Sequence, residues 1–114
     1  MKIRDAEKIL QAKIICGERF LDKEIEYAFS SDLMSDVLTI DKGRVALLTG
    51  LATIQTIRTA EMAMINVIII VRDKKVSPEM TALADENDIV LMQFKGSMFA
   101  ASGILYKAGL KPVY

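Results

Sequence analysis

The sequence contains no histidine and only one cysteine, Cys16, among its 114 residues. Without histidine the chain lacks the usual general base near neutral pH and the commonest metal ligand, which excludes Ser-His and Cys-His catalysis within it. One cysteine cannot form an internal disulfide, which fits a reducing compartment, so we expect a cytoplasmic protein. Burial as a small hydrophobic side chain at a strand end is the simplest interpretation of Cys16.

The chain also has no excess of positive or negative charge, because 15 Lys and Arg residues balance 15 Asp and Glu residues. Zero net charge argues against broad electrostatic binding to nucleic acid or an anionic membrane, and it does little to keep copies of the chain apart. The amino end lacks an apolar signal core, and the longest aliphatic run, residues 67–71, is too short to span a bilayer. We therefore expect neither nucleic acid nor membrane as a partner.

A hydrophobic fraction of 52% and a charged fraction of 26% are typical of a globular chain, and residues 1–114 are expected to form a single domain. We expect strands at residues 13–16, 24–29, 44–48, 67–71 and 89–93. Helical patterns occupy residues 5–10, 33–38, 53–64, 77–86 and 97–107. Strand and helix alternate from residue 44 onward, which implies right-handed crossovers. The predicted fold class is α/β, a layered sheet of mainly parallel strands with flanking helices.

Periodicity also predicts which side chains face the core. Asp5 is expected to cap the first helix, whose inner face carries Ala6, Ile9 and Leu10. One face of the second strand is expected to carry Ile25, Tyr27 and Phe29. Asn87 is expected to be a left-handed helix stop. The methionines expected to fill the core are Met34, Met62, Met64, Met80, Met92 and Met98.

Polar side chains follow the strands at the ends where ligands bind in parallel α/β sheets. Residues 30–36 place two carboxylates and three hydroxyl groups between a strand and a short helical turn. Backbone amides at the starts of the helices at residues 53 and 97 could hold an anion, with charge added by Lys95 or Arg72. The candidate ligand-binding residues are Ser31, Asp32, Ser35, Asp36, Thr49, Gly50, Arg72 and Ser97.

Each of these polar groups also has a purely structural interpretation. Ser31 or Asp32 can cap a helix, and Ser97 can do the same for the last helix. Thr49 and Gly50 can form an ordinary turn, because no P-loop lysine pattern or Gly-x-Gly-x-x-Gly motif is present. Residues 72–75 can form a solvated loop.

Asp32 and Asp36 lie four residues apart, so they would share a face if the segment were helical. Paired carboxylates can bind a divalent metal or divide acid and base roles, but two carboxylates without further ligands make a weak metal site. We therefore assign no catalytic residue, no metal ligand and no cofactor.

Four small residues, Ala100, Ala101, Ser102 and Gly103, lie in the middle of the last predicted helix. Small side chains let another backbone approach closely. This stretch therefore predicts either tight packing of the helix on its own sheet or a helix-to-helix contact between two subunits.

Several segments resemble the DRTGG domain family, whose fold is shared with the amino-terminal domain of HPr kinase/phosphorylase. Residues 9–25 are similar to the opening helix, strand and turn of that kinase domain. Residues 31–38 resemble a segment of stand-alone members and of members fused to pyrophosphatases. Residues 47–50 and 57–62 are similar to the small stand-alone group. The likeness covers nearly the whole chain.

The two signatures that give the family its name, Asp-Arg after one strand and Thr-Gly-Gly after the next, are absent. Residues 49–52 read Thr-Gly-Leu-Ala and residues 71–74 read Val-Arg-Asp-Lys. The resemblance therefore transfers no ligand role to these positions. It implies a regulatory or assembly module, since relatives are attached to nucleotide-sensing CBS pairs, family II inorganic pyrophosphatases and phosphotransacetylases. The ATP-binding motif of HPr kinase is absent, so no phosphotransfer activity is implied.

The primary hypothesis is a non-catalytic regulatory or assembly module that forms a homodimer. Zero net charge, the lack of histidine, the small-residue helix and the family resemblance all favour it. The alternative is a sensor for a small ligand, either a nucleotide or another anionic metabolite. A small metal-dependent enzyme using Asp32 and Asp36 is the least favoured hypothesis.

Overall fold

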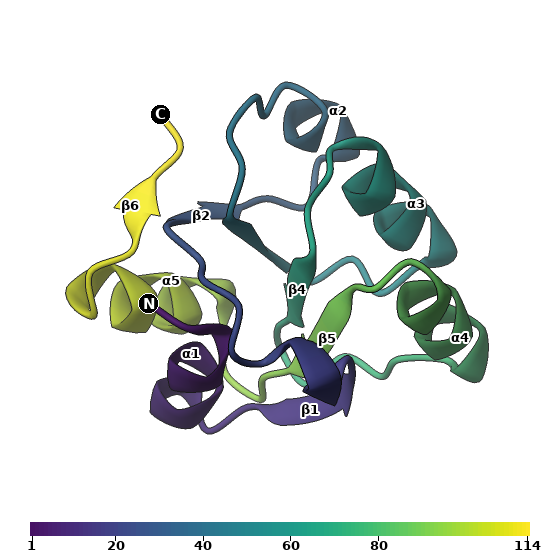
Figure 1. Ribbon diagram of the computed structural model, residues 1–114, viewed down its shortest axis with the longest axis horizontal. Coiled ribbons are helices and arrows are strands. Elements are labelled where there is room, and N and C mark those ends of the chain that lie inside the picture. The colour runs from purple at the N-terminus through teal and green to yellow at the C-terminus, as the bar shows by residue number, and fades with distance from the viewer.

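The computed structural model places all 114 residues around one six-stranded sheet (Figure 1). The strands are β1 (Lys13–Cys16), β2 (Tyr27–Ser30), β3 (Val45–Thr49), β4 (Val67–Ile70), β5 (Val90–Gln93) and β6 (Lys111–Pro112). The helices are α1 (Ile3–Leu10), the 3-10 turn η1 (Glu18–Phe20), α2 (Met34–Val37), α3 (Ile54–Met62), α4 (Pro78–Glu86) and α5 (Met98–Lys107). No helix has the length and apolar character needed to cross a bilayer.

The strands follow the order β1-β5-β4-β3-β2-β6 across the sheet. All neighbouring pairs are parallel except β1 with β5. Helices α2, α3 and α4 cover one face of the sheet, and α1 and α5 cover the other (Figure 1). The predicted α/β class with mainly parallel strands is confirmed.

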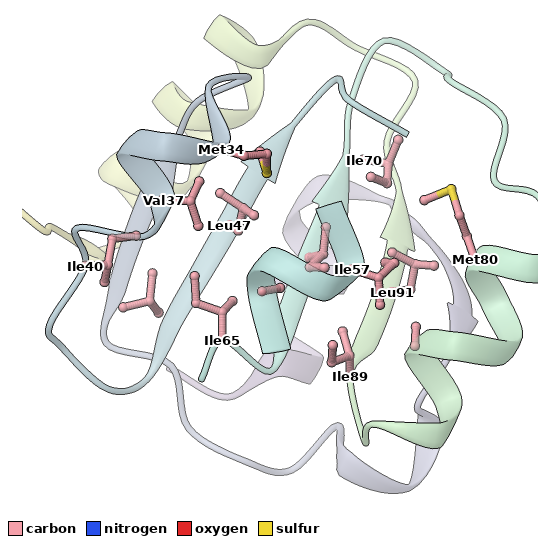
Figure 2. Close-up of a cluster of buried hydrophobic side chains, with 14 of the residues drawn as sticks. Met34, Val37, Ile40, Leu47, Ile57, Ile65, Ile70, Met80, Ile89 and Leu91 are labelled. Carbon is pink, nitrogen blue, oxygen red and sulfur yellow. The ribbon is translucent and has the colours of Figure 1, made fainter. Parts of the chain in front are cut away.

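Two hydrophobic clusters, one on each face of the sheet, form the core. Every residue of β3 and β4 is buried, because both faces of these strands are covered by helices. Figure 2 shows the cluster beneath α2, α3 and α4, where Leu47, Ile70 and Leu91 of the sheet meet Ile57 and Met80 of the helices. The second cluster packs Ala46, Leu48 and Ile69 against α1 and α5.

Three helices begin at hydroxyl side chains, two of which, Ser77 and Ser97, the sequence predicts as caps. The side chains of Thr53, Ser77 and Ser97 accept hydrogen bonds from the backbone amides of Thr56, Met80 and Ala100. These bonds satisfy amides that have no partner inside the helix. The helix start predicted at Ser77 and Pro78 is confirmed.

The predicted start of the first helix is wrong. The helix begins at Ile3, and Asp5 lies in its first turn, where its carboxylate accepts a hydrogen bond from the Lys2 amide at 3.1 Å. Ile9, expected inside, is 42% exposed, because Ile3, Ala6 and Leu10, spaced three and four residues apart, form the inner face of the helix.

The second strand is also shorter than expected, since it begins at Tyr27. The amides of Glu26 and Tyr27 both donate to the carbonyl oxygen of Arg44, which breaks the regular alternation at this point. Ile25 therefore packs in the cluster beneath α1 and α5, whereas Tyr27 and Phe29 pack on the opposite face. The expectation that these three side chains share one face is wrong.

Two methionines expected in the core are exposed, Met62 by 66% and Met64 by 82%. Helix α3 ends at Met62, and Met64 adopts φ 60° in the turn that leads into β4. Met34, Met80 and Met92 are buried as predicted. The left-handed residue after α4 is Asp88, with φ 57°, instead of Asn87.

A short strand that sequence patterns did not predict, β6, pairs with β2 at one edge of the sheet. It consists of Lys111 and Pro112. Proline has no amide to donate, so it is tolerated in a strand mainly at a sheet edge. Pro112 occupies such an edge.

A matched pair of methionines tests the core. Met80→Ala should lower the free energy of unfolding by about 2–5 kcal/mol, because it removes a fully buried side chain. Met62→Ala, at an exposed helix end, should change that free energy by less than about 0.5 kcal/mol. Urea denaturation followed by circular dichroism measures both, and equal losses would contradict the assignment of Met80 to the core.

Candidate functional site

The parallel register brings three strand ends together at one edge of the sheet. Ser30 of β2 lies beside Leu48 of β3, and Thr49 lies beside Ile70 of β4. The residues that follow these strands therefore become neighbours. We call Asp32, Thr49, Gly50 and Arg72 the edge cluster.

Asp32 connects the end of β2 to the end of β3. Its Oδ1 accepts hydrogen bonds from Thr49 Oγ1 at 2.9 Å and from the backbone amide of Gly50 at 2.7 Å. Thr49 is fully buried, so its hydroxyl group needs a partner inside the protein. The Asp32 side chain itself is half exposed, at 50%.

Arg72 follows β4 and lies over the same point. Its guanidinium nitrogen is 3.9 Å from Asp32 Oδ2. A Cβ atom at Gly50 would lie 2.6 Å from that guanidinium group, so only glycine leaves room for Arg72 in this position. The arginine side chain thus approaches the backbone of Gly50 directly.

The backbone at Arg72 holds the side chain there in a conformation that is uncommon for residues other than glycine. Arg72 and Asp73 have φ angles of 62° and 54°. Two backbone hydrogen bonds stabilise the turn, from Arg72 N to the Gly96 oxygen at 2.7 Å and from Asp73 N to the Phe94 oxygen at 3.0 Å. Residues 72–75 are all exposed, as the interpretation as a solvated loop predicts, and these bonds make the start of that loop an ordered turn.

The other candidate residues lie outside the edge cluster. Ser31 forms a local turn by accepting from the Leu33 amide at 3.0 Å, and Ser97 caps α5. Ser35 and Asp36 are exposed. Neither Ser31 nor Asp32 caps α2, whose cap position is Leu33 without a side-chain bond.

The two carboxylates proposed as a pair are separated by the start of a helix. Helix α2 begins at Met34, so Asp32 precedes it and does not share a helical face with Asp36. The structure contains no group of three or more histidine, cysteine, aspartate or glutamate side chains that could hold a metal ion.

The edge cluster brings together three donors whose chemistry suits an oxygen anion. An amide N–H, a hydroxyl group and a guanidinium group are all donors that favour negatively charged oxygen. In this structure the carboxylate of Asp32 takes that role. The edge cluster lies at the surface. Two cavities lie elsewhere, one of about 620 Å³ between β1 and α4 and one of about 390 Å³ near Arg44 and Met64.

A second surface feature is the outward side of α5. Phe99 is 90% exposed and Tyr106 is 71% exposed. Gly103 lies between them in sequence, and no atom lies within 4 Å of the place where its Cβ would be. We call Phe99, Gly103 and Tyr106 the α5 face. The stretch of small residues in the sequence predicted a role for this helix. It did not identify Phe99, which lies four residues before Gly103 and on the same side of the helix.

The single cysteine has the buried environment that its sequence context predicts. Cys16 is 7% exposed, and its thiol donates to the carbonyl oxygen of Ile89 at 3.5 Å. Burial, followed by the charge of Asp85, raises the pKa of this thiol, which disfavours the nucleophilic thiolate. Two other groups with shifted values lie at the exposed surface: Asp88 raises the pKa of Arg19, and Arg4 lowers the pKa of Asp22.

No family model matches the sequence, and no curated protein matches it. The chain is similar in structure to the CBS and DRTGG domains of the regulatory region of Clostridium perfringens pyrophosphatase, complexed with the activator diadenosine tetraphosphate. The TM-score is 0.73 at 15% sequence identity. The match covers 98% of this chain and 48% of that one, so this chain spans about half the length of its neighbour.

This comparison shows that the chain has a DRTGG-like α/β fold, as the sequence resemblance implied. The fold places the edge cluster at the carboxyl ends of parallel strands, where α/β proteins commonly bind ligands. The likeness concerns the fold alone.

The hydrogen bonds of Asp32 predict a cost for removing its carboxylate. Asp32→Ala should lower the free energy of unfolding by about 1–3 kcal/mol, because the buried Thr49 hydroxyl loses its acceptor. Asp36→Ala is the matched control and should change stability by less than about 0.5 kcal/mol. Equal effects in urea denaturation would show that the bonds of Asp32 do not contribute to folding.

Proposed function

We propose that this chain is a non-catalytic regulatory or assembly module that acts as a homodimer. The observation that carries the proposal is the exposed α5 face, with a phenylalanine that is 90% accessible to solvent. Burying such a side chain releases ordered water and is worth about 1.5–3 kcal/mol. The chain itself offers no covering segment for it.

The open position beside Gly103 also supports contact between two α5 helices. Glycine inside a helix costs about 1 kcal/mol of stability relative to alanine. No part of the chain fills the space beside Gly103, so packing within the chain does not explain why a glycine stands there. Close approach by another molecule does explain it.

The α5 face is complementary to itself. Phe99 is a projecting side chain and Gly103 is an open site one helical turn away on the same side, about 6 Å along the axis. Two antiparallel copies of α5, related by a two-fold axis that crosses the outward side of the helix midway between Phe99 and Gly103, would each insert Phe99 above Gly103 of the other copy. A symmetric dimer requires such a patch, in which one surface matches itself.

Size and charge are compatible with this arrangement. A stable interface removes about 800 Å² from each partner, roughly an eighth of the 6172 Å² that the chain exposes. The surface continues from Tyr106 into a hollow of about 100 Å³ lined by Ser102 and Pro112. Helix α5 carries no acidic residue, and the chain has no net charge to oppose association.

Self-association can be tested by sedimentation velocity or light scattering at high micromolar concentration. The wild-type chain should form a dimer, and Phe99→Glu should be a monomer because it places charge at the centre of the interface. Met62→Glu makes a similar change on an exposed residue of α3 and should leave the dimer intact. A monomeric wild type would contradict the proposal.

Gly103→Leu separates association from folding. It fills the site that receives Phe99, so it should also give a monomer. Its stability to urea should be no lower than that of the Phe99→Glu monomer, because nothing in the chain contacts this position and leucine favours helix more than glycine. The wild-type dimer is not the reference, since association itself adds stability. A Gly103→Leu chain that still dimerises would exclude α5 as the interface.

A second candidate function is the sensing of a nucleotide or another anionic metabolite. It is supported by the donors of the edge cluster and by the nucleotide activator bound to the similar pyrophosphatase region. A thermal-shift screen of nucleotides and phosphorylated metabolites on the wild-type chain should find a stabilising compound, since a ligand at a hundred times its dissociation constant adds about 2.7 kcal/mol. A screen without any shift would contradict sensing.

A further inference from the structure

We propose that the edge cluster is a phosphoryl-binding site that Asp32 occupies when no ligand is bound. The Gly50 amide, the Thr49 hydroxyl and the Arg72 guanidinium are the groups that would bind the phosphoryl oxygens. The carboxylate of Asp32 stands where those oxygens would be. This inference rests on the proposed sensing function and does not depend on self-association.

The bond distances show that the donors already converge on one anionic oxygen. Thr49 Oγ1 and Gly50 N lie 2.9 and 2.7 Å from the same atom, Asp32 Oδ1. The bond from the Gly50 amide has the short length of a charge-assisted hydrogen bond, and the bond from the Thr49 hydroxyl lies within the ordinary range for a hydroxyl donor. The site therefore needs no rearrangement of β3 to accept an oxygen of a phosphoryl group in place of a carboxylate oxygen.

The position of Arg72 favours a ligand role over a purely structural one. At 3.9 Å from Asp32 Oδ2, its guanidinium is too distant for a direct hydrogen bond to that oxygen. Two successive residues in the left-handed region and a glycine beneath the guanidinium keep Arg72 over the cluster. A tetrahedral phosphoryl group offers more oxygens than a carboxylate and can reach all three donors.

Asp32 can leave the cluster without loss of the core. Its side chain is 50% exposed, and it belongs to the segment between β2 and α2, which is outside the regular elements. Ligand binding in the wild type therefore requires that the carboxylate be displaced. The apparent dissociation constant is then the intrinsic constant divided by the fraction of molecules in which the site is open.

Removing the carboxylate should expose the site. Inorganic phosphate is the probe, and thermal shift and isothermal titration calorimetry are the measurements. Asp32→Ala should bind phosphate saturably with a dissociation constant at least about tenfold lower than that of the wild type, because no internal anion competes. Asp36→Ala is the matched control and should behave as the wild type does.

Two further variants make the test decisive. Asp32→Asn keeps an oxygen that accepts from Thr49 and Gly50, so it preserves folding, and the loss of charge should still tighten phosphate binding. Asp32→Ala combined with Arg72→Gln should lose the gain. If folded Asp32→Asn and Asp32→Ala bind phosphate no better than the wild type, or if the Arg72→Gln combination retains the gain, the inference is overturned.

Thermal shifts with nucleotides and with sugar phosphates then show which kind of compound supplies the phosphoryl group. A compound that stabilises the wild type but not Arg72→Gln supports the edge cluster as its site, and comparing adenosine monophosphate with ribose 5-phosphate shows whether the base contributes. A nucleotide that stabilises both chains equally keeps the sensing function and overturns this inference. Phosphate binding by Asp32→Ala without any compound that stabilises the wild type supports the cluster and contradicts the sensing function.

Discussion

Burial of the central strands from both sides is the constraint on which the rest of the structure depends. β3 and β4 have no exposed residue, because helices cover each face of the parallel sheet. The apolar side chains along these strands therefore build the two halves of the core, and only Thr49, at the end of β3, brings a polar side chain to the sheet edge. Polar chemistry is left to the strand ends, and contacts with other molecules are left to the outer sides of the helices.

The edge cluster follows from this constraint. Thr49 ends a fully buried strand, and its hydroxyl group must be satisfied by another part of the chain. Asp32 supplies the acceptor from the end of β2, and no buried side-chain polar atom in the structure is left without a partner. The same donors that satisfy a carboxylate are suited to a phosphoryl group, so the arrangement that stabilises the fold is also the proposed ligand site.

The α5 face and the edge cluster are separate surfaces joined by a short segment. The hydroxyl of Ser30, at the end of β2, shares a 2.6 Å hydrogen bond with the hydroxyl of Ser102 on α5. Asp32 lies two residues beyond Ser30. This hydrogen bond connects the end of β2, which leads to the edge cluster, with the helix that carries the α5 face.

The sequence by itself determined the α/β class, the alternation of strands and helices after residue 44 and the caps at Ser77 and Ser97, because these depend on neighbours a few residues apart. Only the tertiary structure decided that Asp32 bonds to Thr49 and Gly50, that β6 pairs with β2 and that Phe99 has no cover. These features depend on which distant segments lie side by side. No local pattern encodes that proximity, since it is set by strand order and register across the sheet.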